Sequence, residues 1–154
     1  MKKFFKRLLV AIIILVALFL IVALFVPKDY TVVRSVDVSA SKQTAYNYMG
    51  DFANFDKWSP WAEMDPDMKI EMSGTAGEVG SLYKWEGNDD VGKGSMEIIR
   101  LTEDSIVIKL LFIEPFESES ITYYAFEDMG ETTKVTWGMS GSNAYPWTLL
   151  TYLM

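Results

Sequence analysis

Few side chains in this sequence could carry acid–base or nucleophilic chemistry. The chain has no histidine and no cysteine, so it lacks the commonest general base, the thiolate nucleophile and the usual ligands of zinc. The carboxylates nearest in sequence to the aromatic positions are Glu63, Asp65, Glu86 and Glu114, and they form no recognisable pair or triad. We interpret them as solvated charges in turns. We therefore predict no catalytic residue, no metal site and no cofactor.

Large apolar side chains offer a different chemistry, the binding of apolar molecules. Methionine and aromatic side chains adapt to varied apolar shapes, as ligand pockets require. They recur at alternate positions from Met68 onward, and two tryptophans flank a Ser59-Pro60 bend that fixes the backbone there. The predicted ligand-binding residues are Trp58, Trp61, Met72, Tyr83, Trp85, Met96, Tyr124, Trp137 and Met139. Each of them is equally typical of an ordinary hydrophobic core.

The elements that position these residues follow from periodicity. Residues 31–38 alternate as a strand does, and Ser41 is a suitable N-cap for a helix over residues 42–49. A second short helix is predicted over residues 52–55. Six further strands are predicted around 68–72, 82–86, 94–101, 105–112, 117–127 and 133–139. Because tight turns link these strands, the sequence predicts an antiparallel sheet with one apolar face.

A hydrophobic stretch begins at Leu8 and ends at Val26 without a charged or polar side chain. As a helix rising about 1.5 Å per residue it is just under 30 Å long, close to the thickness of a bilayer core. It follows four basic residues, Lys2, Lys3, Lys6 and Arg7. The positive-inside rule then places the N-terminus in the cytoplasm. We predict a single-pass membrane protein, with a cytoplasmic stub and anchor over residues 1–27 and one extracytoplasmic domain over residues 28–154.

Two other interpretations fit this stretch less well. A cleavable signal peptide has an apolar region of about 7–15 residues and a small-x-small cleavage site, and this run is longer and lacks such a site. A buried core helix needs a large protein around all its faces, and the rest of the chain is too small to supply one. The pattern favours an uncleaved anchor.

The charge of the remaining chain excludes one class of partner. Of the 14 basic and 21 acidic residues, four basic residues precede Leu8, which leaves 10 against 21 and a net charge of −11 beyond the anchor. Phosphate contacts need lysine and arginine, so this composition argues against nucleic-acid binding. It also predicts repulsion from anionic lipid headgroups.

The pattern over residues 30–139 resembles the SRPBCC superfamily, which includes the START, polyketide-cyclase/dehydrase and pollen-allergen-like helix-grip proteins. Together with the anchor it resembles a membrane-anchored bacterial branch. The segments that carry the resemblance are residues 38–41, 45–48, 51–61, Gly80, 85–87, 92–94 and 132–137. The resemblance implies an α+β helix-grip fold, in which a curved antiparallel sheet holds a long C-terminal helix over a hydrophobic cavity.

The end of the chain departs from that pattern. Residues 143–154 are almost wholly apolar, and Pro146 suits the first turn of a helix. The chain ends about two turns later without a polar cap. We expect that the grip helix is missing, that it lies beyond Met154, and that the domain is incomplete at its C-terminus.

The leading hypothesis is a membrane-anchored module that binds an apolar or amphipathic small molecule, or a lipid, in a cavity between sheet and helix. One alternative is a cyclase-, dehydrase- or hydrolase-like enzyme that uses carboxylate and tyrosine chemistry. Another is a protein-interaction module like the co-chaperones of the superfamily, with the Trp58–Trp61 corner as its anchor patch. The sequence favours a non-enzymatic domain. We also expect at least one of these indoles to pack against Tyr83 or Trp85.

Overall fold

The computed structural model describes residues 2–143, 145–146 and 148, and the chain divides into two compact units. One unit is built on α1 (Lys2–Phe25), a 24-residue helix that is long and apolar enough to cross a membrane; a signal sequence would have the same properties. The helix predicted from Leu8 is therefore confirmed, and it begins one and a half turns earlier. The predicted division at residue 27 stays a prediction. The helix expected over residues 143–154 falls largely outside the described residues.

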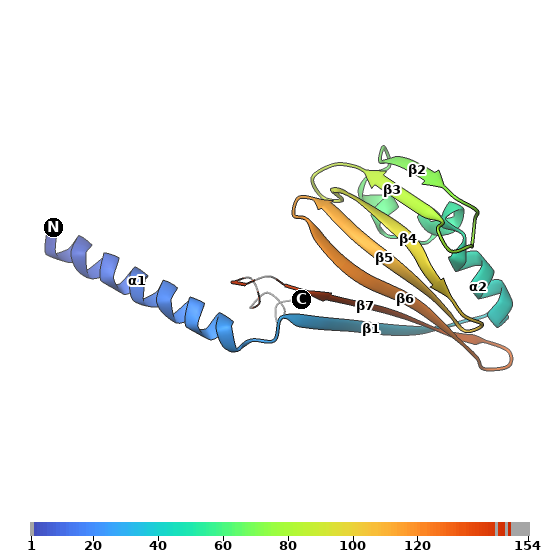
Figure 1. Cartoon of the computed structure of the whole chain (residues 1–154), viewed down its shortest axis with the longest axis horizontal. Coiled ribbons are helices and arrows are strands. Elements are labelled where there is room, and N and C mark those ends of the chain that lie inside the picture. The colour runs from blue at the N-terminus through green and yellow to red at the C-terminus, as the bar shows by residue number, and fades with distance from the viewer. Residues whose placement is uncertain (1, 144, 147, 149–154) are drawn as a thin grey trace. The chain divides into compact units, whose positions relative to one another are not determined.

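The second unit, residues 31–141, holds most of a seven-stranded sheet in the order β1-β7-β6-β5-β4-β3-β2 (Figure 1). The strands are β1 (Asp29–Val38), β2 (Lys69–Ser73), β3 (Leu82–Glu86), β4 (Lys93–Leu101), β5 (Ser105–Glu114), β6 (Ser118–Asp128) and β7 (Thr133–Ser142). Every pair from β2 to β7 is antiparallel. The predicted strands and the predicted antiparallel sheet are confirmed; the position of β1 beside β7 was not predicted.

The two ends of the chain segment that forms the sheet lie side by side. The backbone N–H of Asn143 donates to the carbonyl of Lys28 over 2.9 Å, and the hydroxyl oxygens of Ser35 and Thr136 are 2.9 Å apart. The later residue of β1, Ser35, contacts the earlier residue of β7, Thr136, so β1 and β7 run antiparallel as well. The first residues of β1 therefore lie beside the last residues of β7.

Short helices follow β1, and the first of them is capped as the sequence predicts. Ser41 caps α2 (Lys42–Gly50) by accepting a hydrogen bond from the Thr44 N–H, and Asp51 caps the 3₁₀-helix η1 (Phe52–Lys57) through the Ala53 N–H. One prediction was wrong here. Trp61 was expected at a bend outside regular structure, but it begins a one-turn helix, α3 (Trp61–Met64), because Pro60 adopts a helical φ and ψ of −66° and −18°.

These helices cover one face of the sheet, which we call the concave face (Figure 1). The Tyr46 ring of α2 lies 5.2 Å from the Phe126 ring of β6, and Gly50 approaches Ile106 of β5. The buried core under this cover consists of Ala45, Phe52, Tyr83, Met96, Ile98, Ile106, Ile108, Leu110, Tyr124, Phe126 and Val135. Burial of this apolar face is the main contribution that holds helices and sheet together.

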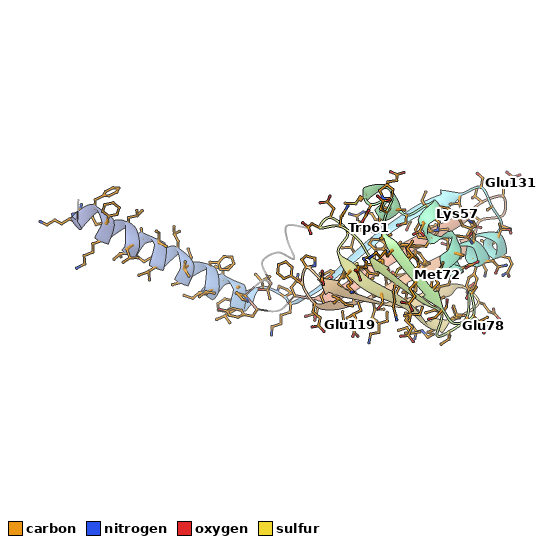
Figure 2. The ribbon with its side chains drawn as sticks, turned by 90° about the horizontal axis from the view of Figure 1, so that it is seen from above. Lys57, Trp61, Met72, Glu78, Glu119 and Glu131 are labelled. Atoms are coloured by element: carbon orange, nitrogen blue, oxygen red, sulfur yellow. The ribbon has the colours of Figure 1, made fainter. Side chains whose placement is uncertain are left out.

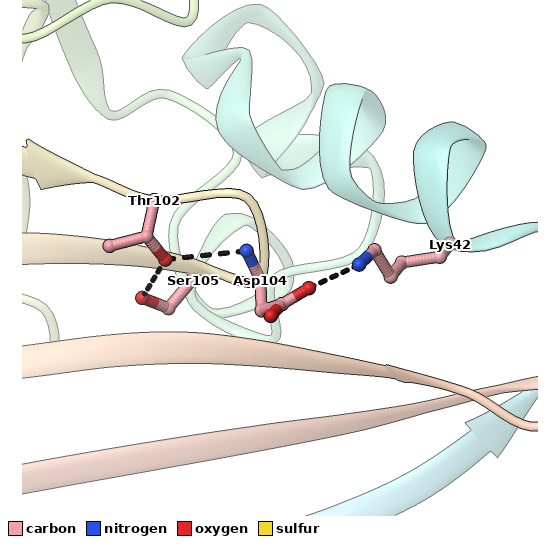
Figure 3. Close-up of polar contacts among 4 residues, drawn as sticks. All are labelled: Lys42, Thr102, Asp104 and Ser105. Atoms are coloured by element: carbon pink, nitrogen blue, oxygen red, sulfur yellow. Dashed lines mark hydrogen bonds and ion pairs between the residues drawn. The ribbon is translucent and has the colours of Figure 1, made fainter.

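Polar contacts fix the start of α2 against the turn between β4 and β5 (Figure 3). Lys42 pairs with Asp104, and this hydrogen bond is the main reason that the pKa of Lys42 is raised above its ordinary value. The Asp104 N–H donates to Thr102, whose hydroxyl oxygen is 2.8 Å from that of Ser105. The turn between β4 and β5 thus fixes the position of α2 over the sheet.

The opposite, convex face carries alternating charges. Four cross-strand ion pairs lie on it: Lys84–Glu71, Lys93–Glu86, Lys109–Glu119 and Lys134–Glu127. All eight side chains are substantially exposed, so each pair contributes little to stability. Their regular placement nevertheless identifies the solvated face, and leaves the concave face as the only apolar face of β3 and β4 among the residues that the structure describes.

Candidate functional site

Seven of the predicted ligand-binding residues lie on strands, and the strand register places all seven on the concave face. Met72, Tyr83 and Met96 are neighbours across β2, β3 and β4, and Tyr124 is directly opposite Trp137. Tyr83, Met96 and Tyr124 are buried in the core, whereas Trp85, Trp137 and Met139 are only partly buried against it. Met72 is exposed at the sheet edge (Figure 2).

The row that joins these residues was missed by sequence reasoning. Met96 and Tyr124 are connected through β5, whose concave-face residues are Ile106, Ile108, Leu110 and Phe112. β5 is apolar on both faces, so its alternation is weak. Lys109 marks the solvent face of this strand in the sequence, so its neighbours are expected to point inward, but none of them was among the predicted ligand-binding residues.

Trp58 covers part of this face from above. It follows η1, and its ring lies 5.0 Å from Phe55 and 5.9 Å from Tyr124, yet the residue remains 38% exposed. Phe55 and Trp58 are three residues apart, and side chains at this spacing eclipse in a 3₁₀-helix. Trp61 is 49% exposed (Figure 2). Among the described residues neither indole forms a ring contact with Tyr83 or Trp85, and the ring that contacts Tyr83 from this side is Phe55, at 5.3 Å.

The segment that carries both indoles is held at its two ends. The Tyr83 hydroxyl donates to the Asp56 carboxylate over 2.6 Å, just before the segment. Just after it, the Asp65 carboxylate accepts from the Asn88 N–H over 2.7 Å. We call residues 58–64 between these contacts the tryptophan strap. It bridges from η1 to the β3–β4 turn across the edge of the concave face.

Comparisons with known proteins identify the architecture. No protein-family profile and no curated protein matches the chain. Among solved structures it is similar to truncated norcoclaurine synthase from Thalictrum flavum, with a TM-score of 0.64, 11% identity and coverage of 84% of this chain and 85% of that one. The domain has the helix-grip fold. Identities this low show the shared fold of the helix-grip domain and not its function.

Two further neighbours have the same architecture. Ginseng major latex-like protein 151 from Panax ginseng has a TM-score of 0.54 and 18% identity, with coverage of 82% of this chain and 90% of that one. The ARO/CYC di-domain protein StfQ of the steffimycin biosynthetic pathway has a TM-score of 0.57 and 14% identity, with coverage of 78% and 39%. The helix-grip domain therefore resembles proteins with different names and roles.

The ionisable side chains near the concave face form hydrogen bonds within the domain. Burial, and then the hydrogen bond to Asp56, raise the pKa of Tyr83 far above its ordinary value, and burial raises that of Tyr124. Both phenols are therefore neutral at physiological pH and are poor proton acceptors. The sequence singled out Asp65 and Glu86; Asp65 binds the Asn88 backbone, and a hydrogen bond from Lys93 lowers the pKa of Glu86. Asp56, the partner of a buried phenol, was missed.

Buried core side chains occupy the centre of the concave face. A hollow of about 140 Å³ lies at its edge, lined by Asp51, Phe52, Ala53, Met72, Ser73, Gly74, Ala76 and Ser81. Pockets for drug-sized ligands are about 300–1,000 Å³, so this hollow is too small for one. A larger hollow beside Lys3 and Val10 is walled by α1 alone. No cluster of three metal-ligating side chains occurs within the described part of the chain.

Proposed function

We propose that the helix-grip domain binds an apolar or amphipathic small molecule on its concave face. One observation carries this proposal: beyond the helical cover, four large side chains remain only partly buried, namely Trp85, Phe112, Trp137 and Met139. Trp85 and Phe112 pack edge to face at 5.8 Å on one side. Trp137 and Met139 lie on the other side, across β6, whose concave-face residues there are the buried Ser120 and Thr122. Large apolar walls suit the apolar part of such a ligand.

A ligand reaches the concave face when the tryptophan strap moves. A ligand of useful size needs more room than the present hollow, and Trp58 is the exposed side chain that stands on buried Tyr124. Movement of residues 58–64 between the Asp56 and Asp65 contacts would uncover Tyr124 without breaking either contact. Two fold neighbours, norcoclaurine synthase and StfQ, bear names from small-molecule biosynthesis, which agrees with a ligand at this face.

Paired tryptophan variants test this binding function. In native mass spectrometry of the full chain released from detergent micelles, the wild type should carry added dodecanoic acid at one molecule per chain. Trp58→Phe should change this affinity several-fold and cost less than about 1.5 kcal/mol of stability, because the swap preserves most of the apolar area. Trp61→Phe, with its exposed indole, is the matched control and should change neither. Loss of stability with unaltered affinity in both variants would make the pair purely structural.

We further propose that α1 is an uncleaved anchor that holds the domain on the extracytoplasmic side of a membrane. The support is that the basic residues lie at the N-terminal end of α1 and that the apolar stretch after them is barely buried. A reporter enzyme that works only outside the cytoplasm should be active when fused after residue 27, and the mature protein should retain the mass of the full chain. Activity of a cytoplasm-only reporter at that position would reverse the assigned orientation.

A further inference from the structure

The turn between β5 and β6 exposes an unusual amount of apolar surface. We call residues 113–117, from the last two residues of β5 to the residue before β6, the Phe116 turn. Phe116 is 82% exposed, and Ile113 is also exposed. A single exposed apolar residue needs no explanation, but here a phenylalanine, a proline and an isoleucine occur together at the tip of a hairpin.

The strand register places this turn at a particular end of the sheet. Phe112 is paired with Ser118, and Ser120 with Gly141 near the end of β7. The end of β7 lies beside the start of β1, so the Phe116 turn is at the end of the sheet where β1 begins (Figure 1). The β6–β7 turn, with exposed Met129, lies at the opposite end.

The chain leading into β1 is short. Only Val26, Pro27 and Lys28 separate the last residue of α1 from the first residue of β1. Such a link spans at most roughly 14 Å. Two to three strand spacings of about 4.8 Å separate β1 from the β5–β6 turn. If α1 spans a bilayer, this end of the sheet cannot be far from the membrane surface.

We propose that the Phe116 turn contacts the surface of the bilayer in which α1 is anchored, with the phenylalanine ring inserted at the headgroup level. This inference rests on the anchor proposed above. Phenylalanine is among the side chains that bury shallowly in the boundary between headgroups and acyl chains. Glu114 and Glu117 flank the tip, so the contact suits a zwitterionic surface and is weakened by anionic lipid.

Site-directed spin labelling tests the contact on the full chain in phosphatidylcholine vesicles. The chain has no cysteine, so a label on Phe116→Cys, Met129→Cys or Val16→Cys reports one position only. Met129 is the matched control, because it is 57% exposed in a turn at the other end of the sheet. Oxygen relaxes a spin label in lipid, and a water-soluble nickel chelate relaxes a label in water. We expect the ratio of the oxygen effect to the nickel effect to be several-fold higher at residue 116 than at residue 129. Anionic lipid at low salt should lower the ratio at 116.

The label at residue 16 separates the two ways in which this inference can fail. A lipid-like signal at 16 with equal, water-like signals at 116 and 129 would overturn the membrane contact and leave the anchor intact. A water-like signal at 16 would overturn the anchor, and the inference with it. Because the Phe116 side chain is almost fully exposed, its replacement should leave packing unchanged, and near-ultraviolet circular dichroism checks that each labelled variant is folded.

Discussion

Replacement of Gly94 by alanine should lower the free energy of unfolding by about 3 kcal/mol or more, at the upper end of the range for overpacked sites. A Cβ at this position would lie 2.3 Å from the Leu111 carbonyl oxygen and 2.4 Å from the Trp85 indole. The Leu111 carbonyl oxygen belongs to the backbone of β5, which is paired with β4. The indole is held as well, because its N–H donates to the Val91 carbonyl over 3.1 Å. Neither neighbour can move without breaking an interaction.

Gly138→Ala is the matched control for this prediction. Its added Cβ would also meet a ring, 2.2 Å from Tyr123, but no backbone atom lies within the same range. Tyr123 is on the convex face and is partly exposed, so its ring can rotate away. Thermal unfolding of both variants in detergent, followed by tryptophan fluorescence, should show the larger fall in midpoint for Gly94→Ala. Equal falls would mean that β4 and β5 can separate slightly at no great cost.

Replacement of Tyr83 by phenylalanine should lower the free energy of unfolding at neutral pH by about 1.5–3 kcal/mol, the usual range for a hydrogen bond to a charged group. The Tyr83 side chain is buried, and its hydroxyl is the donor to Asp56 at the start of the tryptophan strap. The ring itself is retained, so its packing against Phe52 and Phe55 should survive. Denaturant titration of the full chain in detergent measures the difference.

The same variant predicts a distinctive pH dependence. Folding raises the pKa of Tyr83, first through burial and then through Asp56. The unfolded phenol therefore loses its proton first, near its ordinary pKa of about 10. Its contribution to stability is complete below that pH and is lost as pH rises toward the folded pKa, by up to about 1.4 kcal/mol per pH unit.

Tyr83→Phe lacks this contribution, whereas the raised pKa of Tyr124 acts in both proteins. The difference in stability between wild type and variant should thus shrink above pH 10. Asp56→Asn should reproduce part of the neutral-pH loss, since it keeps a weaker acceptor for the phenol. A difference that stays constant from pH 8 to pH 11 would show that Tyr83 titrates alike in the folded and unfolded chains.

Local features were predictable from the sequence because local interactions decide them. Ser41 caps α2 as expected, since a hydroxyl placed before a helical segment satisfies an N–H that has no other partner. In β6, alternation from Ser118 to Phe126 identified the inward side chains correctly, because each strand residue faces away from its neighbours. Tight turns between strands made the antiparallel order almost inevitable.

Contacts between distant segments could not be predicted from the sequence. Asp56 and Tyr83 are 27 residues apart, and nothing in the sequence distinguishes Asp56 from other carboxylates before the chain folds. β5 is apolar on both faces, so Lys109 is its one local signal, and the pairing of β5 between β4 and β6 places its inward side chains in the core. Trp58 lies on Tyr124 rather than near Trp85 because η1 continues to Lys57 and turns the indole over β6.

The sequence by itself determined the apolar helix at the N-terminus, the seven strands, the antiparallel pairing of the consecutive strands β2 to β7 and the face that is apolar. All of these depend on residue type and spacing, which act over a few positions along the chain. The tertiary structure alone decided that Asp56 binds a buried phenol, that side chains occupy the concave face beneath the tryptophan strap, and that the Phe116 turn shares an end of the sheet with the start of β1. These features depend on how the sheet curves and on which side chains meet across it, and such long-range packing leaves no periodic signal in the sequence.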